Sequence, residues 1–142
     1  MTYTGNAAGA LNAYNQVSVQ AGVGVASPHR LIQMLLEAAL EKIAAAKGYM
    51  ANGKIPEKCE QLTTATAIVE GLRVSLDKNA GGEIASNLEG LYDYIERQLT
   101  VANSNNDMAI LDEVAGLLRP IKEAWDAIPQ EVQDAHQSRP GA

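Results

Sequence analysis

The chain has 142 residues, which is enough for one domain with a hydrophobic core. Its net charge of −6 repels phosphate backbones and no basic patch compensates, so we expect no nucleic-acid partner. The single cysteine, Cys59, excludes an internal disulfide. No apolar run approaches the roughly 20 residues of a membrane span, and residues 1–9 lack the features of a signal peptide. We therefore expect a cytoplasmic protein without membrane insertion.

Residues 1–26 are predicted to form a flexible segment that carries a short capping helix. Leu11, Tyr14 and Val17 recur at every third position, which indicates two or three helical turns. Gly22 and Gly24 then interrupt the pattern. The short helix should thus be joined to the rest of the chain by a glycine hinge.

The second predicted helix begins at Ser27-Pro28, a capping residue followed by a proline suited to the first helical position. It should end near Met50, before Asn52-Gly53. Its apolar residues cover an arc of roughly 200°, about twice that of an ordinary bundle helix. Two interpretations stay open: the N-terminal helix covers the excess, or the excess is a docking groove for a partner helix. Both hold if the N-terminal helix is a reversible cover.

Three further helices follow, each with an apolar stripe at helical spacing. The first spans residues 56–77 and is followed by a turn at 79–82. The next spans residues 83–102, with Ile84, Leu88, Leu91, Ile95, Leu99 and Ala102 inward. The last spans residues 107–128, with Leu117 or Leu118, Ile121 and Trp125 among its inward residues, and Pro120 should kink it.

Short turns between these helices force neighbours to run antiparallel. The predicted fold is therefore all-α: an antiparallel up-down four-helix bundle over residues 27–128, with a short extra N-terminal helix. Residues 129–142 are polar and lack periodicity, so we expect a disordered or frayed tail.

The titratable residues argue against an enzyme. The two histidines are His29 and His136, and neither stands in the Glu-x-x-His pair of a di-metal bundle. Gly81-Gly82 is not followed by the Lys-Ser/Thr pair of a phosphate loop. A helical phosphotransfer module would need an exposed mid-helix histidine, whereas His29 lies at a helix terminus. We predict no catalytic residue, no cofactor and no metal.

Short motifs follow one another along most of the chain, from about Ala13 to Ile128. They are Ala13-Tyr14, residues 26–32 with Met34-Leu35, Ile68-Val69, Leu76-Asp77, residues 81–85, Asn87-Leu88, residues 91–95, Ala102-Asn103, Glu113-Val114, Leu117-Leu118 and Ala124-Trp125. In this order they resemble the flagellin-specific export chaperone family, FliS. Pro120 and the Gly- and Ala-rich start of the chain depart from the family pattern.

The resemblance implies a four-helix bundle that binds the disordered C-terminal segment of flagellin. Such a chaperone prevents premature polymerisation and delivers its cargo to a cytosolic component of the flagellar type III export gate. The segment around Ala13-Tyr14 is implied to cover the binding surface and to move aside. The alternative is a helical adaptor or structural bundle without chaperone activity, and a homodimer stays open.

Partner-binding residues are expected in three places. They are Leu11, Tyr14 and Val17 in the cover, Leu31, Met34, Leu35 and Ala38 on the second helix, and Asn87, Tyr94, Gln98 and Val101 on the fourth. Alternatives stay open here too: Tyr92 and Tyr94 pack against neighbouring helices, and Asn87 hydrogen-bonds within the bundle. Trp125 is expected in the core.

Overall fold

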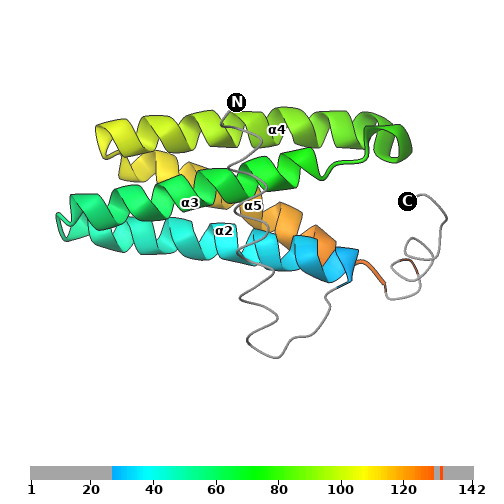
Figure 1. Ribbon diagram of the computed structural model, residues 1–142, viewed down its shortest axis with the longest axis horizontal. Helices are drawn as coiled ribbons and strands as arrows, with labels where there is room; N and C mark the ends of the chain where they lie inside the picture. Colours follow the sequence, from blue (N-terminus) through cyan, green and yellow to red (C-terminus); the bar gives the residue numbers. More distant parts are fainter. Residues whose placement is uncertain (1–26, 130–131, 133–142) are drawn as a thin grey trace.

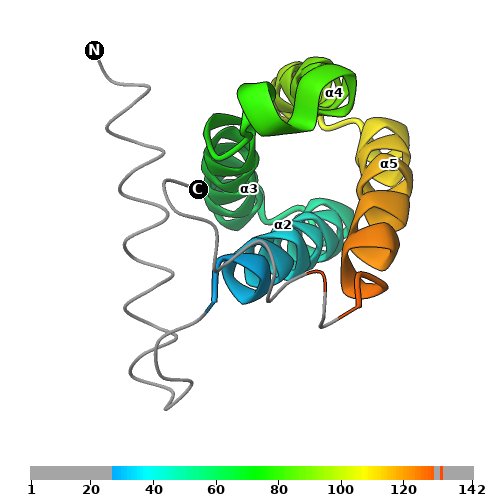
Figure 2. The same cartoon turned by 90° about the vertical axis from the view of Figure 1, so that its right-hand side faces the viewer.

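The computed structural model describes residues 27–129 and residue 132. They form the helices α2 (Pro28–Ala51), α3 (Ile55–Val74), α4 (Lys78–Asn105) and α5 (Met108–Asp126), and these residues contain no strand. Consecutive helices run antiparallel in Figure 1, and the end-on view of Figure 2 shows them as a closed ring in which α5 returns to α2. The predicted all-α four-helix bundle is confirmed. The expected N-terminal helix and nearly all of the expected tail lie outside the described residues.

Side-chain caps start three of the four helices. The Ser27 hydroxyl accepts the N–H of Arg30 at 3.0 Å, and Pro28 occupies the first turn as predicted. Asp77 caps α4 and Asp107 caps α5, each through its carboxylate. Because each cap satisfies N–H groups that have no partner inside the helix, the starting points are encoded locally.

The connection between α3 and α4 differs from the expected turn at residues 79–82. Lys78 already begins α4, and Gly82 then interrupts the helix with φ 53° and ψ −127°. A side chain on Gly81 would place its Cβ 2.8 Å from the Cβ of Ala85. The predicted start of this helix is therefore wrong by about one helical turn. That extra turn comes before Gly82, whose backbone conformation only glycine adopts easily.

The core is aliphatic, as the composition requires, and it draws on all four helices. Its fully buried large side chains include Leu35, Leu36, Ile43, Leu62, Val69, Leu72, Ile95, Leu99, Leu111, Val114 and Leu118. Ile84 was predicted to point inward, and this is wrong because its side chain is 72% exposed. Ile84 follows the break at Gly82, and this turn of α4 buries Ala85, at 4% exposure, in place of Ile84.

One buried cation ties the far end of the bundle together. Lys58 is almost completely buried, and its Nζ donates to the backbone oxygen of Asn103 at 2.7 Å. Asn103 lies in the last turn of α4, where carbonyl groups have no helical donor and the helix dipole favours a positive charge. Lys58 therefore holds the start of α3 against the end of α4.

The last helix runs through Pro120 without a break. The proline cannot donate to the carbonyl of Gly116, and Gly116 is exposed, so solvent can replace the lost bond. Figure 1 shows α5 crossing the bundle obliquely, close to α4 at its start and close to α2 at its end. None of the four described helices has the length and apolar character of a membrane span.

Candidate functional site

One carboxylate joins α4 to the first half of α5. Tyr94 donates its hydroxyl to Glu113 at 2.9 Å, and the side-chain amide of Gln98 donates to the other Glu113 oxygen at 3.2 Å. The first of these bonds raises the pKa of the Tyr94 hydroxyl. Within the described residues, these two bonds to Glu113 are the side-chain hydrogen bonds or ion pairs that link α4 to α5.

Beyond Glu113, both helices carry apolar side chains that the bundle covers incompletely. Residues three or four positions apart share a helix face, so the faces of Tyr94 and Glu113 continue toward Gly82 on α4 and toward Asp126 on α5. We call this set the α4–α5 face; its members are Ile84, Leu88 and Leu91 of α4 and Leu117 and Ile121 of α5. Leu117 was one of two candidates for the core, and the structure buries Leu118 instead.

The candidate residues on α2 lie mostly inside the protein. Leu35 is completely buried and Ala38 nearly so, and both belong to the core cluster. Met34 is buried, and Leu31 is partly exposed. Because α2 packs against both α3 and α5, its wide apolar arc is largely used by the bundle itself. The surplus inferred from the arc is therefore not found at Leu35 and Ala38.

The candidate residues on α4 lie on its outer side, toward α5. Val101 is 40% exposed. Asn87 is exposed as well, and its side chain forms no hydrogen bond with another described residue. Tyr94 and Gln98 are partly exposed and already bonded to Glu113. Tyr92, by contrast, is buried in the core, which confirms the alternative that it packs against neighbouring helices. The three candidates of the N-terminal cover, Leu11, Tyr14 and Val17, lie outside the described residues.

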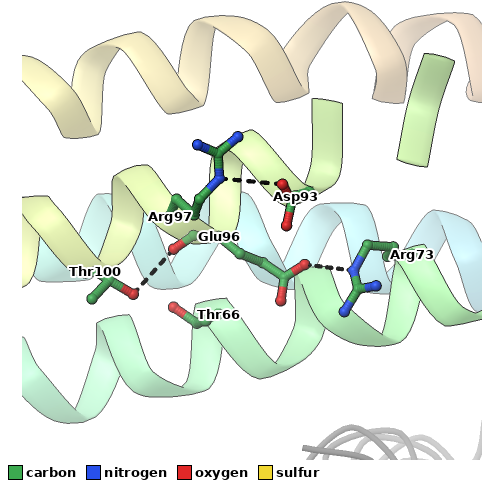
Figure 3. A pocket seen from close by; sticks show the side chains of 6 residues that line it. All are labelled: Thr66, Arg73, Asp93, Glu96, Arg97 and Thr100. Carbon is green, nitrogen blue, oxygen red and sulfur yellow. Dashed lines mark hydrogen bonds and ion pairs between the residues drawn. The ribbon is translucent and has the colours of Figure 1, made fainter. Parts of the chain in front are cut away.

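A polar depression lies on the other side of α4, against α3. Figure 3 shows its lining, which consists of Thr66, Arg73, Asp93, Glu96, Arg97 and Thr100 around a volume of about 370 Å³. Both hydroxyls donate to backbone oxygens one turn back in their own helix, and Arg97 pairs with Asp93. The two hydroxyls and Arg97 therefore already have partners on their own helices.

In the lining of the depression, the Arg73 guanidinium interacts with two carboxylates. Arg73 donates to Glu96 at 2.9 Å and lies 3.9 Å from the buried Glu70. The bond to Glu96 raises the pKa of Arg73, whereas burial raises the pKa of Glu96 despite that bond. The cluster clamps α3 to α4. No group of three potential metal ligands occurs among the described residues.

Comparisons with known proteins decide the family. The family model "Flagellar protein FliS" matches residues 10–132. The chain belongs to the FliS family. It is 47% identical over 119 residues to the "Flagellar secretion chaperone FliSB" of Pseudomonas aeruginosa, covering 84% of this chain and 94% of that protein.

Two further relatives bear the name "Flagellar secretion chaperone FliS". The protein of Vibrio cholerae is 46% identical over 123 residues, which cover 87% of this chain and 90% of the relative. The protein of Salmonella typhimurium is 45% identical over 122 residues, which cover 85% and 90%. The resemblance inferred from the ordered motifs is thus confirmed.

Two of the motifs that resemble FliS proteins meet in space although they lie at opposite ends of the bundle sequence. His29 in the first turn of α2 stacks on Trp125 in the last turn of α5, with ring centroids 4.8 Å apart and planes 8° from parallel. His29 Nε2 lies 2.9 Å from the Trp125 carbonyl oxygen, and Trp125 Nε1 donates to the His29 carbonyl at 2.9 Å. We call this arrangement the His29–Trp125 clasp.

Sequence reasoning about this FliS-family protein missed part of the α4–α5 side. Glu113 was noted as part of a motif but not as the acceptor for Tyr94 and Gln98. Ile84, Leu117 and Ile121 were assigned inward or left undecided. A partial signal existed in Gly82, where the backbone of α4 leaves the helical conformation just before Ile84.

Proposed function

We propose that this FliS-family protein is a cytoplasmic export chaperone that binds the disordered C-terminal segment of flagellin. Binding prevents premature polymerisation, and the complex delivers its cargo to the cytosolic side of the flagellar type III export gate. The proposal is supported by relatives that are named flagellar secretion chaperones and that match over most of the chain.

The observation that carries the proposal is the α4–α5 face. A partner helix with apolar residues at spacings of three and four can lay its apolar side along such a face. Ile84, at 72% exposure, is free to add buried area when a partner docks. Masking the apolar side of a flagellin segment removes the surface through which such segments associate with one another.

Coupled folding sets the strength of this interaction. Ordering a disordered segment costs about 2–5 kcal/mol, and such complexes typically bury ~1,000–3,000 Å². The polar groups of Tyr94, Gln98 and Glu113 border the face and supply hydrogen bonds that orient the bound segment. Asn87 and Val101 extend the same side of α4.

The N-terminal segment is proposed as a cover, through Leu11, Tyr14 and Val17. If the cover must leave before cargo binds, the apparent affinity falls by the fraction of molecules that are uncovered. That arrangement holds flagellin in the cytoplasm and still allows its release at the gate. Removal of residues 1–20 should therefore strengthen binding.

Titration calorimetry with a peptide of the flagellin C-terminal segment tests the proposal. We expect binding with a negative heat-capacity change, because apolar surface is buried. Ile84→Ser should weaken it by roughly tenfold or more, since a buried isoleucine is worth about 1.5–3 kcal/mol. Val74→Ser is the matched control, because Val74 is 60% exposed but lies on α3 and is not a member of the α4–α5 face.

Absence of binding by the wild-type protein and by the truncated protein would remove the chaperone assignment in favour of a structural adaptor. Equal losses from Ile84→Ser and Val74→Ser would keep the chaperone but move its binding surface away from the α4–α5 face.

A further inference from the structure

The last helix is attached to the bundle in two different ways along its length. Its first half bridges two neighbours, because Glu113 bonds to α4 while Asp112 pairs with Lys47 of α2. Among the described residues, the side chains of its second half bond to no helix other than α2 and α5 itself. There, Trp125 engages His29, and Asp126 accepts the side-chain amide of Gln33 at 2.5 Å. The end of α5 is therefore held toward α2 and not toward α4.

The clasp that makes this second attachment is a reciprocal contact. Each ring bonds to the other residue's backbone carbonyl while the two rings stack. The partners lie in terminal helical turns, so the contact joins two helix ends and leaves the middle of the bundle untouched. Such a contact fixes the direction in which α5 leaves the bundle.

The direction of α5 decides what remains uncovered on α4. Leu117 and Ile121 on α5 and Ile84, Leu88 and Leu91 on α4 are all incompletely buried. Two adjacent apolar surfaces gain free energy by closing on each other, because closure removes both from water. A contact that holds them apart must oppose this tendency, and the clasp lies at the end of α5 where it can do so.

We propose that His29 and Trp125 are positioning residues that hold the second half of α5 on α2 and so keep the α4–α5 face open for a partner helix. This inference rests on the proposed function for its purpose, but its geometry can be tested without flagellin. Neither residue belongs to the α4–α5 face, so each acts by setting the position of α5.

Spin labels measure the geometry directly. In a Cys59→Ser background, labels at Ser86→Cys on α4 and Glu123→Cys on α5 use exposed positions on the two helices that border the face. The clasp is broken by His29→Ala, or weakened by Trp125→Phe, which keeps an aromatic ring and loses the N–H donor. We expect the distance distribution to shift to shorter values in both variants, more so in His29→Ala.

The control is Ile43→Val, which trims one methyl group from the core about four turns along α2 from His29. It lowers stability without touching the clasp, so the label distance should stay that of the parent. Trp125 is the only tryptophan, and its fluorescence therefore reports loss of stacking in His29→Ala. A lost stacking signal with an unchanged label distance would overturn the inference.

Peptide binding gives the second readout. If the α4–α5 face closes, only a fraction of the molecules can bind the peptide at any time. Both clasp variants should therefore bind the flagellin peptide more weakly, by roughly tenfold for His29→Ala. Ile43→Val should bind like the wild type. Equal affinities for all variants would overturn the inference while leaving the proposed function intact. If the wild type itself does not bind, the proposed function fails, and the label distances still decide the geometry of the clasp.

Discussion

α2 and α4 are both long amphipathic helices, yet the bundle treats them differently. α2 packs against α3 on one flank and α5 on the other, and residues such as Leu35 and Ile43 lose all contact with water. α4 also packs against two helices, α3 and α5, but its side-chain hydrogen bonds to α5 in the described part of the chain all reach Glu113, and Ile84 and Leu91 keep part of their surface exposed. The number of apolar residues on a helix therefore does not reveal where surplus surface lies; the neighbours on its two flanks do.

The largest expected effect compares one residue from each helix. Leu35→Ala on α2 should lower the free energy of unfolding by about 2–5 kcal/mol, because it leaves a cavity in a fully packed core. Ile84→Ala on α4 should change it by no more than about 0.5 kcal/mol, because the side chain is mostly in water. Urea unfolding measures both. A comparable loss from Ile84→Ala would mean that the α4–α5 face is covered in the free protein.

Two tyrosines sharpen the contrast between the inner and outer sides of α4. Burial raises the pKa of Tyr92 to about 12 from an ordinary value of 10.0. Between these values the unfolded phenol loses its proton first, so stability falls as pH rises from 10 toward 12, by about 3 kcal/mol for two pKa units.

The measurement is urea unfolding as a function of alkaline pH. Tyr92→Phe should remove this part of the decline. Tyr94→Phe, on the outer side, is the matched control and should leave the part of the decline that comes from Tyr92, because Tyr94 is a separate phenol whose hydroxyl bonds to Glu113. An identical alkaline decline in wild type and Tyr92→Phe would contradict the assignment of Tyr92 to the core.

The smallest expected effect concerns the break that begins the exposed part of α4. Gly82→Ala should destabilise the protein by about 1–3 kcal/mol, because φ 53° with ψ −127° strains any residue with a side chain. Gly90→Ala should instead stabilise it by about 0.5–1 kcal/mol, since Gly90 is helical and its added Cβ meets open space. Thermal unfolding separates the two signs, and a neutral Gly82→Ala would show that the break can relax into a regular helix.

The candidate site was only partly accessible to sequence reasoning. Helical spacing placed Tyr94 and Gln98 on one strip of α4, off its core stripe, and the structure brings both to a single acceptor, Glu113. The same spacing marked Leu35 as surplus, because a helical wheel cannot tell that two helices flank α2. Spacing also placed Ile84 inside, because spacing alone does not show that the break at Gly82 changes which residues of the next turn face the core, where Ala85 is buried and Ile84 is not.

What the sequence alone determined is local in origin. Ser27-Pro28 starts a helix, and periodic apolar residues identify the all-α bundle with its aliphatic core. The ordered motifs were sufficient for the family. Only the tertiary structure decided which flank of each helix has a neighbour. That choice depends on contacts between residues 96 positions apart, such as His29 with Trp125, and no local preference encodes the path of α5 that they set.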